Sequence, residues 1–471
     1  MPSTHQKALE INLEKSWYGT FAEIGAGQET ARWFFRVGGA AGTVAEAISA
    51  YDKAVSDLRY GATPRFVTRK RLRAMLAQEW DKLVEKLGPQ RGDHTSFFVF
   101  ANTVAQRSWS RHDDGHGWVG VRFQTAPGAE PSDVIIHAFC RDGETVREQE
   151  ALGVLGVNLL WAALRHHAEP ARIIQELLDD LSRDRIEVDV IDFRGPAFAG
   201  VDNRLMALQL VEQERTDAAL FTAAGEVVQP ADVLYKRPVV VERGQFRPIT
   251  RLTHDILHRG VEALKALPDV AGEEPLVVLE MTLRDLTVAE QIDHEDFLSR
   301  ADALGALGHH VLISRFAPYY ALSQYLAHYT NRPIGLAMGI PTLEQLADAR
   351  FYQDLRGGLI ESAGRLFTNQ VRAFVYPRRD AGSGRVTGLA DFALTGPAQH
   401  LLAYLVETGQ LVATAPSDPA LLDIDQDAVC QLIGTRDARW EAQVPAAAAA
   451  VIRDRGLFCK RACPPGVVSV P

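Results

Sequence analysis

The sequence predicts an α/β protein of two Rossmann-like units, the first with a mixed sheet and the second with a mostly parallel, wound sheet. The chain has 471 residues. Because a single hydrophobic core stops growing at roughly 250–300 residues, we expect more than one domain. Apolar residues make up 46% and charged residues 23% of the chain, as is typical of globular proteins. Short apolar runs alternate with segments of helical length, which indicates βαβ connections.

The densest glycine signal lies near the N-terminus. Gly38, Gly39, Gly42 and Thr43 precede residues 44–57, which are expected to form a helix. Glycines let backbone N–H groups approach an anion, and a helix N-terminus adds positive partial charge, so these four residues are candidate phosphate ligands. The pattern is neither a Walker loop nor the dinucleotide fingerprint, and a tight turn with close backbone packing is the alternative.

The first half of the chain predicts the mixed sheet. Strands are expected at residues 97–101, 118–123, 134–139, 187–193, 218–221 and 239–241, and helices at 148–165, 170–182 and 203–214. Prolines and glycines separate the second strand from the third, which predicts an antiparallel hairpin. A sheet with both a hairpin and βα connections contains antiparallel and parallel pairs.

Two histidines and two aspartates gather between residues 111 and 118. His116 and Asp113 are candidate catalytic residues for proton transfer, because loops held on a rigid sheet often carry catalytic groups. Glycines at 115 and 117 argue against a helix, so the spacing of His112 and His116 predicts no metal site. A solvated turn is the alternative.

A second candidate anion ligand stands at the start of the predicted helix 203–214. Asp202 is a natural N-cap, whose carboxylate accepts a backbone N–H bond. Arg204 is the candidate for holding an anion at that helix start. Solvation at the surface is the default explanation for the other basic residues nearby.

The second half predicts the parallel sheet. Strands are expected at 276–280, 310–314, 334–338 and 371–376, with helices at 296–307, 319–329, 342–349 and 358–367. These strands are mostly apolar, as is typical of strands covered on both faces. Parallel strands need crossover connections, so their carboxyl ends are expected at one edge of the sheet. The expected domains are residues 1–247, residues 248–400, and a helical extension over 401–471.

Polar residues follow these apolar strands. Glu280, Ser314 and Arg315 stand at strand ends. Ligands of open α/β sheets bind outside the carboxyl ends of the strands, so these three residues are candidate ligand-binding residues. Because a buried carboxylate is costly unless it is paired, an ion pair of Glu280 with Arg284 or Arg315 is the alternative.

Composition and charge predict the partners and the cellular compartment of the protein. The formal net charge of −10 gives no large positive field, so nucleic acid is not an expected partner. Charged residues interrupt the first 15 positions, and the longest apolar stretch, residues 151–164, is too short for a bilayer. Four scattered cysteines are expected as free thiols of a reducing compartment. We therefore expect a cytoplasmic protein without membrane segments.

The segments Gly19–Glu29, Gly38–Thr43, His116–Gly120 and Gly200–Leu210 resemble an uncharacterised bacterial protein family over nearly the whole chain. Members carry the labels nicotinate-nucleotide adenylyltransferase or TonB-dependent receptor. The receptor label conflicts with the N-terminal sequence, which has no export signal. The adenylyltransferase label implies a nucleotidyl-transfer site with a His-x-Gly-His element. This sequence has Asp114, Gly115 and His116 but lacks the preceding histidine at the required spacing, where Asp113 stands.

These expectations combine into one functional hypothesis and one competitor. The hypothesis is an intracellular, nucleotidyltransferase-like enzyme that binds a nucleotide or a phosphorylated metabolite, with no cofactor or metal specified. The competitor is a non-catalytic, self-assembling or regulatory protein. Its homo-oligomer would form through the Ala/Leu-rich C-terminal segments.

Overall fold

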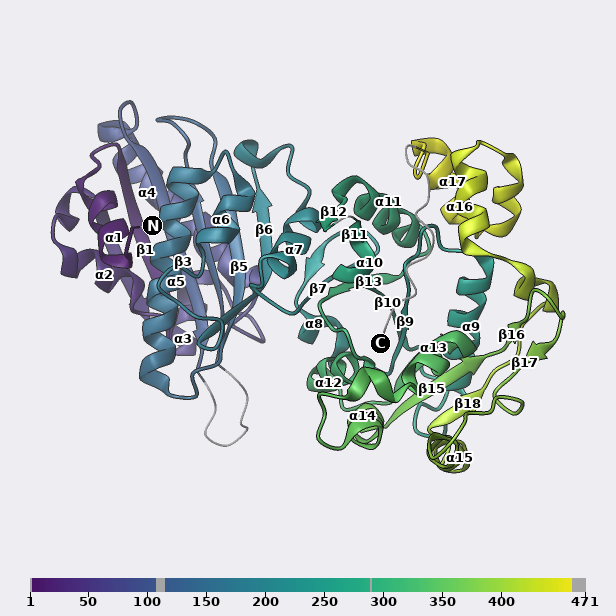
Figure 1. Ribbon diagram of the computed structural model, residues 1–471. Coiled ribbons are helices and arrows are strands. Elements are labelled where there is room, and N and C mark those ends of the chain that lie inside the picture. Colours follow the sequence, from purple (N-terminus) through teal and green to yellow (C-terminus); the bar gives the residue numbers. More distant parts are fainter. Residues whose placement is uncertain (1, 107–114, 289, 369, 460–471) are drawn as a thin grey trace. The chain divides into compact units, whose positions relative to one another are not determined.

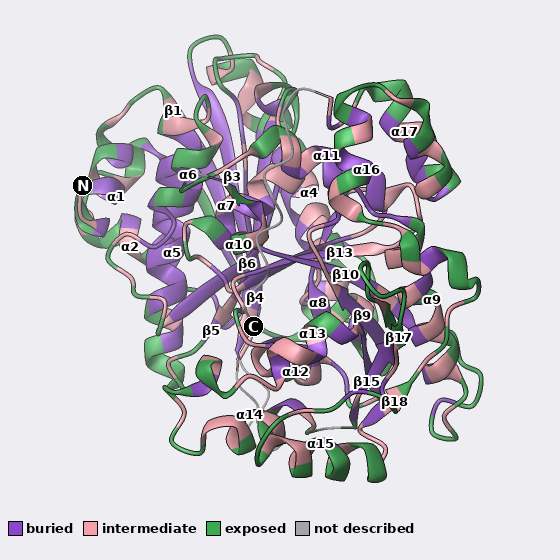
Figure 2. Ribbon diagram, turned by 45° about the vertical axis from the view of Figure 1, so that its right-hand side comes forward, coloured by how far each residue is buried: buried purple, intermediate pink, exposed green. Residues whose placement is uncertain are grey.

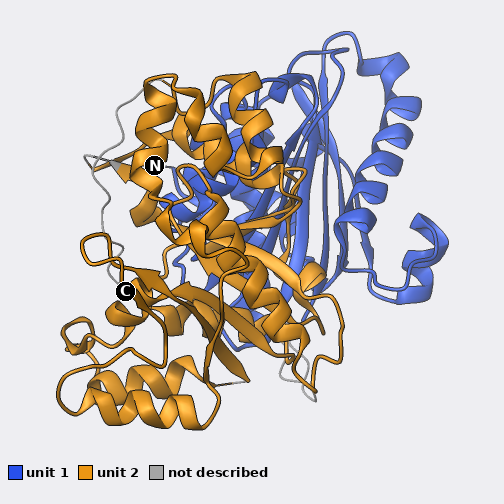
Figure 3. Ribbon diagram, turned by 90° about the vertical axis from the view of Figure 1, so that its right-hand side faces the viewer, with its two compact units in different colours: residues 1–217 blue, residues 218–471 orange. Residues whose placement is uncertain are grey.

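The computed structural model describes residues 2–106, 115–288, 290–368 and 370–459 (Figure 1). The chain forms two compact units, Met1–Asp217 and Ala218–Pro471 (Figure 3). The predicted fold class is confirmed, because the first unit holds a six-stranded mixed sheet and the second an eight-stranded, mostly parallel sheet. In both sheets the central strands are almost entirely buried (Figure 2).

The sheet of the first unit has the strand order β2-β1-β3-β4-β5-β6. The pairs β2–β1 and β1–β3 are parallel, and the pairs β3–β4, β4–β5 and β5–β6 are antiparallel. The predicted hairpin is the β4–β5 pair. Its strands are β1 (Trp17–Gly25), β2 (Val44–Ala50), β3 (Ser96–Ala105), β4 (His116–Phe123), β5 (Ser132–Cys140) and β6 (Ile186–Arg194).

Helices cover both faces of this sheet (Figures 1 and 3). The long helix α4 (Arg69–Arg91) packs on one face against β1, β3 and β4. The apolar helix α5 (Thr145–His166) packs on the other, where it contacts three further helices. These are α1 (Thr4–Leu13), α2 (Thr30–Val37) and α6 (Pro170–Glu176); α3 (Lys53–Tyr60) and α7 (Asn203–Glu212) complete the unit.

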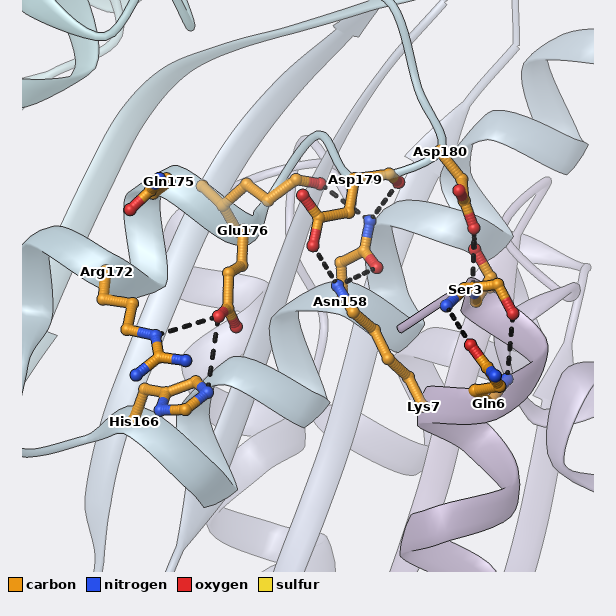
Figure 4. A network of polar contacts seen from close by, with 12 residues as sticks. Ser3, Gln6, Lys7, Asn158, His166, Arg172, Gln175, Glu176, Asp179 and Asp180 are labelled. Atoms are coloured by element: carbon orange, nitrogen blue, oxygen red, sulfur yellow. Dashed lines mark hydrogen bonds and ion pairs between the residues drawn. The ribbon is translucent and has the colours of Figure 1, made fainter. Parts of the chain in front are cut away.

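A buried lysine joins α1 to α5 and to the segment after α6 (Figure 4). Lys7 is fully buried, and its Nζ donates to Asp179 Oδ2 at 2.6 Å and to Asn158 Oδ1 at 2.9 Å. Asn158 Nδ2 in turn donates to the carbonyl oxygens of Leu177 and Asp179. The lysine charge is thus compensated by one carboxylate and one amide, as burial of an ammonium group requires.

The prediction of a helix over residues 44–57 is wrong. Residues 44–50 form strand β2 at the edge of the sheet, and helix α3 begins only at Lys53. Over residues 47–50 of β2, burial alternates, with Ile48 and Ala50 buried and Ala47 and Ser49 exposed. This period of two is that of a strand and not of a helix.

The sheet of the second unit has the order β18-β15-β14-β9-β10-β13-β7-β8. Six strands from β18 to β13 run parallel, and the β7–β8 hairpin joins antiparallel beside β13. Its strands are β7 (Ala218–Phe221), β8 (Val227–Val228), β9 (Val239–Arg243), β10 (Leu276–Thr282), β13 (His310–Ser314), β14 (Ile334–Gly339), β15 (Val371–Tyr376) and β18 (Leu411–Ala413).

This topology places the unit boundary at residues 217 and 218 instead of 247 and 248. Strands β7, β8 and β9 hydrogen-bond within the second sheet, so residues 218–247 belong to the second unit. The segment 401–471, expected as a helical extension, likewise contributes the edge strand β18. A short strand between helices has too few apolar positions to show from the sequence which sheet it joins.

The helices of the second unit lie on both faces of its sheet. Gly260 of α9 faces Val240 and Ala337, whereas α12 and α13 pack on the opposite face with Val239 and Val241. The helices are α8 (Pro230–Leu234), α9 (Arg251–Lys265), α10 (Leu283–Leu286), α11 (His294–Gly305), α12 (Tyr319–Tyr329), α13 (Ile340–Leu346), α14 (Gly358–Leu366), α15 (Ala398–Glu407), α16 (Gln426–Gly434) and α17 (Ala446–Arg455). Two short strand pairs, β11–β12 (Thr287–Val288, Gln291–Ile292) and β16–β17 (Arg378–Arg379, Val386–Thr387), lie outside the sheet.

Two further expectations concern cysteines and membranes. Cys140 and Cys459 are free thiols, whereas Cys430 is disulfide-bonded, so the expectation of free thiols is wrong for Cys430. Within the described part of the chain, none of the helices has both the length and the apolar character that crossing a bilayer demands.

Candidate functional site

A row of three buried polar side chains crosses the second sheet near the carboxyl ends of its strands. Glu280 on β10 lies between Arg243 on β9 and Ser314 on β13. Arg243 donates from Nε to Glu280 Oε2 at 2.8 Å and from Nη2 to Oε1 at 2.9 Å. Ser314 Oγ donates to the same Oε1 at 2.6 Å. The Glu280 carboxylate is therefore fully engaged from both neighbouring strands.

Strand register produces this pairing. Glu280 is directly opposite Arg243 in the parallel β9–β10 ladder, and Ser314 is opposite Thr282 in the β10–β13 ladder. The Arg243 and Glu280 side chains are 4% and 0% exposed. Such a bidentate pair gives the geometry that two buried charges need. The sequence analysis expected Arg284 or Arg315 as the partner of Glu280, and this expectation is wrong.

Arg243 is held by two further contacts. Its Nη1 donates to the carbonyl oxygen of Ala317 at 2.9 Å, and its guanidinium lies 4.3 Å from the centre of the Tyr319 ring. Burial is the largest single influence on the pKa of Arg243 and lowers it. The charge and hydrogen bonds of Glu280, together with the nearby Tyr319 and Asp285, outweigh burial, so the pKa of Arg243 is raised. Arg243 is thus a fixed positive charge at the sheet edge.

A pocket of about 170 Å³ opens at this edge. Three arginines contribute to its wall, Arg243 after β9, Arg284 after β10 and Arg315 after β13. Thr282, Asp285 and Ala317 also line it. Asp285 caps the helix start by exchanging hydrogen bonds with Thr282, so its carboxylate is directed to the backbone.

The pocket lies at the carboxyl edge of this sheet but to one side of its switch point, over β9, β10 and β13. The order of the six parallel strands is that of the doubly wound dinucleotide-binding fold, and its switch point lies between β9 and β14. The turn after β9 carries Gly244 but no glycine-rich fingerprint, and the Gly244 N–H donates to the carbonyl oxygen of Glu280 at 3.1 Å. The fold thus offers a binding edge without the pyrophosphate loop of dinucleotide enzymes.

The other strand ends at this edge have different partners. Tyr376 Oη, at the end of β15, donates to Asp255 Oδ2 of α9 at 2.6 Å. Gly339, at the end of β14, is the N-cap of α13. The expectation that the parallel strands end at one edge is confirmed by their ladders. Of the predicted ligand residues at this edge, Arg315 lines the pocket, whereas Glu280 and Ser314 belong to the buried row.

The glycine-rich segment of the first unit forms a turn packed on α1. Asn12 Nδ2 donates to the carbonyl oxygen of Gly38 at 2.7 Å, and Thr43 Oγ1 donates to that of Ile11 at 3.3 Å. Gly38 and Gly39 both have positive φ, which explains the need for glycine. Gly42 ends a 3₁₀ turn, and strand β2 follows Thr43. The helix N-terminus on which phosphate binding was expected to rest is therefore absent.

Arg204 is engaged by the helix cap beside it. Its backbone N–H and its Nε both donate to Asp202 Oδ1, and its Nη2 donates to Oδ2 at 2.7 Å. Asp202 is the N-cap of α7, as predicted. Asp113 lies outside the described residues.

His116, the other predicted catalytic residue, is the first residue of β4 and is half-buried. Its Nδ1 lies 3.0 Å from His137 Nε2, and His137 Nδ1 lies 2.6 Å from Asp189 Oδ1. Sequence reasoning missed His137 and Asp189, because each stands inside a predicted apolar strand and carries no local motif. In the described ranges, no group of three or more His, Cys, Asp or Glu side chains is arranged to hold a metal ion.

Comparisons with known proteins give only distant likeness. No protein-family model and no curated protein matches the sequence. A competence or damage-inducible protein from Enterobacter asburiae is 12% identical with a TM-score of 0.26, over 35% of this chain and 99% of that one. The CihA protein from Agrobacterium tumefaciens is 15% identical with a TM-score of 0.25, over 34% and 96%. A Vibrio parahaemolyticus protein, provisionally assigned as a nicotinate-nucleotide adenylyltransferase, is 13% identical with a TM-score of 0.21, over 48% and 98%. Likeness at this level carries no functional argument.

Function therefore has to be argued from the sites themselves. The pocket of the second unit is lined by three arginines and one aspartate, and Glu280 compensates the charge of one of these arginines, Arg243. Such a wall suits an anion, and guanidinium groups match phosphate oxygens in bidentate geometry.

Proposed function

We propose that the second unit binds a phosphorylated small molecule at the pocket lined by Arg243, Arg284 and Arg315. The observation that supports this most directly is that three arginines line one pocket at the carboxyl edge of a doubly wound sheet. Ligands of this sheet type bind at that edge, and arginine is over-represented where phosphate is recognised.

The size of the pocket selects among phosphorylated ligands. Its volume of about 170 Å³ is below the roughly 300–1,000 Å³ of pockets that enclose a whole drug-sized ligand. A phosphate group and the atoms next to it fit this space, whereas the rest of a nucleotide would extend beyond it. The absence of a glycine-rich turn after β9 likewise favours a phosphomonoester over a dinucleotide.

The buried row beneath the pocket has a positioning role in this proposal. Glu280 fixes the guanidinium plane of Arg243, and Ser314 fixes Glu280, so Arg243 presents the same face to every ligand. Preorganised donors of this kind bind an anion without a large cost for ordering the side chains.

Calorimetric titration of the full chain tests the proposal. AMP and inorganic phosphate are the phosphate-bearing probes, and adenosine is the matched probe without phosphate. Hydrogen bonds to charged groups contribute about 1.5–3 kcal/mol, so Arg284→Gln and Arg315→Gln should each weaken AMP binding by roughly tenfold or more. Arg356→Gln, an exposed arginine elsewhere in the same unit, is the control and should leave binding unchanged.

Two outcomes would contradict the proposal. One is AMP binding with wild-type affinity in the Arg284→Gln/Arg315→Gln variant, provided its melting temperature matches that of the wild type. The other is equal affinity for adenosine and AMP. If no probe binds and light scattering shows an assembly that grows with concentration, the self-assembling alternative takes its place.

A further inference from the structure

A second polar row crosses the sheet of the first unit. It runs from Asp189 on β6 through His137 on β5 to His116 on β4, with separations of 2.6 Å and 3.0 Å between the bonded atoms. His137 is fully buried and Asp189 is 3% exposed, whereas His116 is half-buried. The row therefore leads from the interior of the unit toward its surface.

A β-bulge brings the carboxylate to the histidine. In the β5–β6 ladder His137 is opposite Val190 and Ala138 is opposite Val188, so Asp189 is the extra residue between them. A bulge re-aims one side chain at the cost of ladder hydrogen bonds, and such irregularities are over-represented next to active sites. Regular pairing would not place Asp189 beside His137 in this way.

Both contacts fit one arrangement of protons. In it His137 donates from Nδ1 to the Asp189 carboxylate, and its Nε2 accepts the Nδ1–H of His116. In this arrangement His116 Nε2 carries a lone pair at the end of the row.

The outer end of the row is open. Among the residues that the structure describes, His116 Nε2 has no hydrogen-bond partner, and it is not among the buried atoms that lack one. Burial, and secondarily the proximity of His137, lower the pKa of His116 to about 4. The ring is therefore neutral at pH 7, with its lone pair available.

We propose that this row is a proton-transfer site, in which His116 Nε2 takes a proton from a bound water molecule or hydroxyl group. The O–H bond breaks, the Nε2–H bond forms, and the electron pair stays on the oxygen, which becomes a nucleophile. His137, held by Asp189, accepts the Nδ1–H of His116 and so keeps the lone pair of His116 on Nε2. His116 is the catalytic residue, and His137 and Asp189 are positioning residues. The site lies within the first unit and does not depend on the phosphate pocket.

Hydrolysis of p-nitrophenyl acetate by the full chain is the first test. His116 accepts a proton of water, the water oxygen bonds to the acetyl carbon, and the bond to the aryl oxygen breaks, which gives acetate and p-nitrophenolate. General base catalysis contributes a factor of about 10²–10⁴ when the pKa of the base lies near the operating pH. His116 is a weaker base, so His116→Gln should lower the rate by roughly tenfold or more. His94→Gln removes an exposed histidine of the same unit and controls for background reaction. Equal rates in wild type and His116→Gln would overturn the proposal.

Asp189→Asn separates a catalytic row from a merely structural one. An asparagine that donates to His137 Nδ1 shifts the proton to His137 Nε2, and His116 then carries its own proton on Nε2. Nitrogen-15 NMR should show both tautomers inverted, with esterase activity reduced to the level of His116→Gln. Inverted tautomers with wild-type activity would contradict the proposal. If Asp189→Asn does not fold, the half-buried His116→Gln variant still decides the question.

Discussion

The two sheets carry similar polar rows that end differently. Each row crosses three adjacent strands, with His116, His137 and Asp189 in the first unit and Arg243, Glu280 and Ser314 in the second. The second row is closed, because the Glu280 carboxylate accepts from both sides and Arg243 is held by further contacts. The first row ends on a ring nitrogen with no partner among the described residues.

This difference suits the second row to positioning a ligand and the first row to transferring a proton. A closed ion-paired row fixes the arginine at the edge of a pocket, with both carboxylate oxygens of Glu280 already bonded. An open row that ends on a ring nitrogen of His116 offers a lone pair that can accept a proton. We therefore assign ligand positioning to the second unit and proton transfer to the first, and the following changes test this contrast from the largest expected effect to the smallest.

Breaking the closed row should cost the most stability. Glu280→Ala leaves the buried Arg243 guanidinium without its carboxylate, which should lower the free energy of unfolding by about 3–5 kcal/mol. Urea denaturation of the full chain measures this. Replacing both residues by leucine removes the two charges together and should restore most of the loss. A single variant as stable as the wild type would show that the row is not closed in solution.

Breaking the open row in its middle should cost somewhat less. His137→Phe keeps an aromatic ring of similar shape but leaves the buried Asp189 carboxylate without its donor, a loss of about 2–3 kcal/mol. The same urea experiment gives the value. Adding Asp189→Leu removes the stranded charge and should recover stability. No difference between the single and the double variant would argue against an ionised Asp189.

The open row should also respond to pH. The pKa of His116 is about 4 in the folded protein, whereas the ordinary pKa of a histidine is 6.5. Between these values the unfolded chain binds the additional proton, so stability is fully present above pH 6.5 and falls as the pH is lowered toward 4. The loss should be about 1–2 kcal/mol, since the half-buried ring is partly solvated.

The His116→Gln variant isolates this contribution from other histidines, such as His309, whose pKa is also lowered to about 4 by burial. The variant should show a shallower loss of stability over the same pH range. An unchanged pH profile would mean that His116 is protonated alike in the folded and unfolded states.

The smallest effect is expected at the outer end of the closed row. Ser314→Ala removes one hydrogen bond to Glu280, while the bidentate contact with Arg243 remains. The expected loss is about 1 kcal/mol in urea denaturation. A loss comparable to that of Glu280→Ala would mean that Ser314, and not Arg243, carries the stabilisation of the carboxylate.

The second sheet was more predictable from the sequence than the first. Strands β13 and β15 coincide with their predicted ranges, because buried parallel strands form continuous apolar runs. Strand β2 was expected as part of a helix, because its exposed Glu46 and Ser49 weaken the apolar signal of an edge strand. Strand β1 was missed because its sequence, WYGTFAEIG, mixes glycine and polar residues with the apolar ones.

The sites were predictable only in part. Glu280, Ser314, Arg315 and His116 could be nominated from their positions at strand ends or in a polar loop. Their partners could not, since Arg243 is 37 residues away from Glu280 in the sequence and Asp189 is 52 residues away from His137. Strand register and a bulge decide those contacts, and neither has a local sequence signature.

A crystal structure of the full chain with bound AMP tests the assignment of the pocket most directly. We predict phosphate oxygens within hydrogen-bonding distance of the Arg284 and Arg315 guanidinium groups, with the Arg243–Glu280 pair intact beneath them. Phosphate bound instead at the turn Gly38–Thr43, with the arginine-lined pocket holding only solvent, would contradict the assignment.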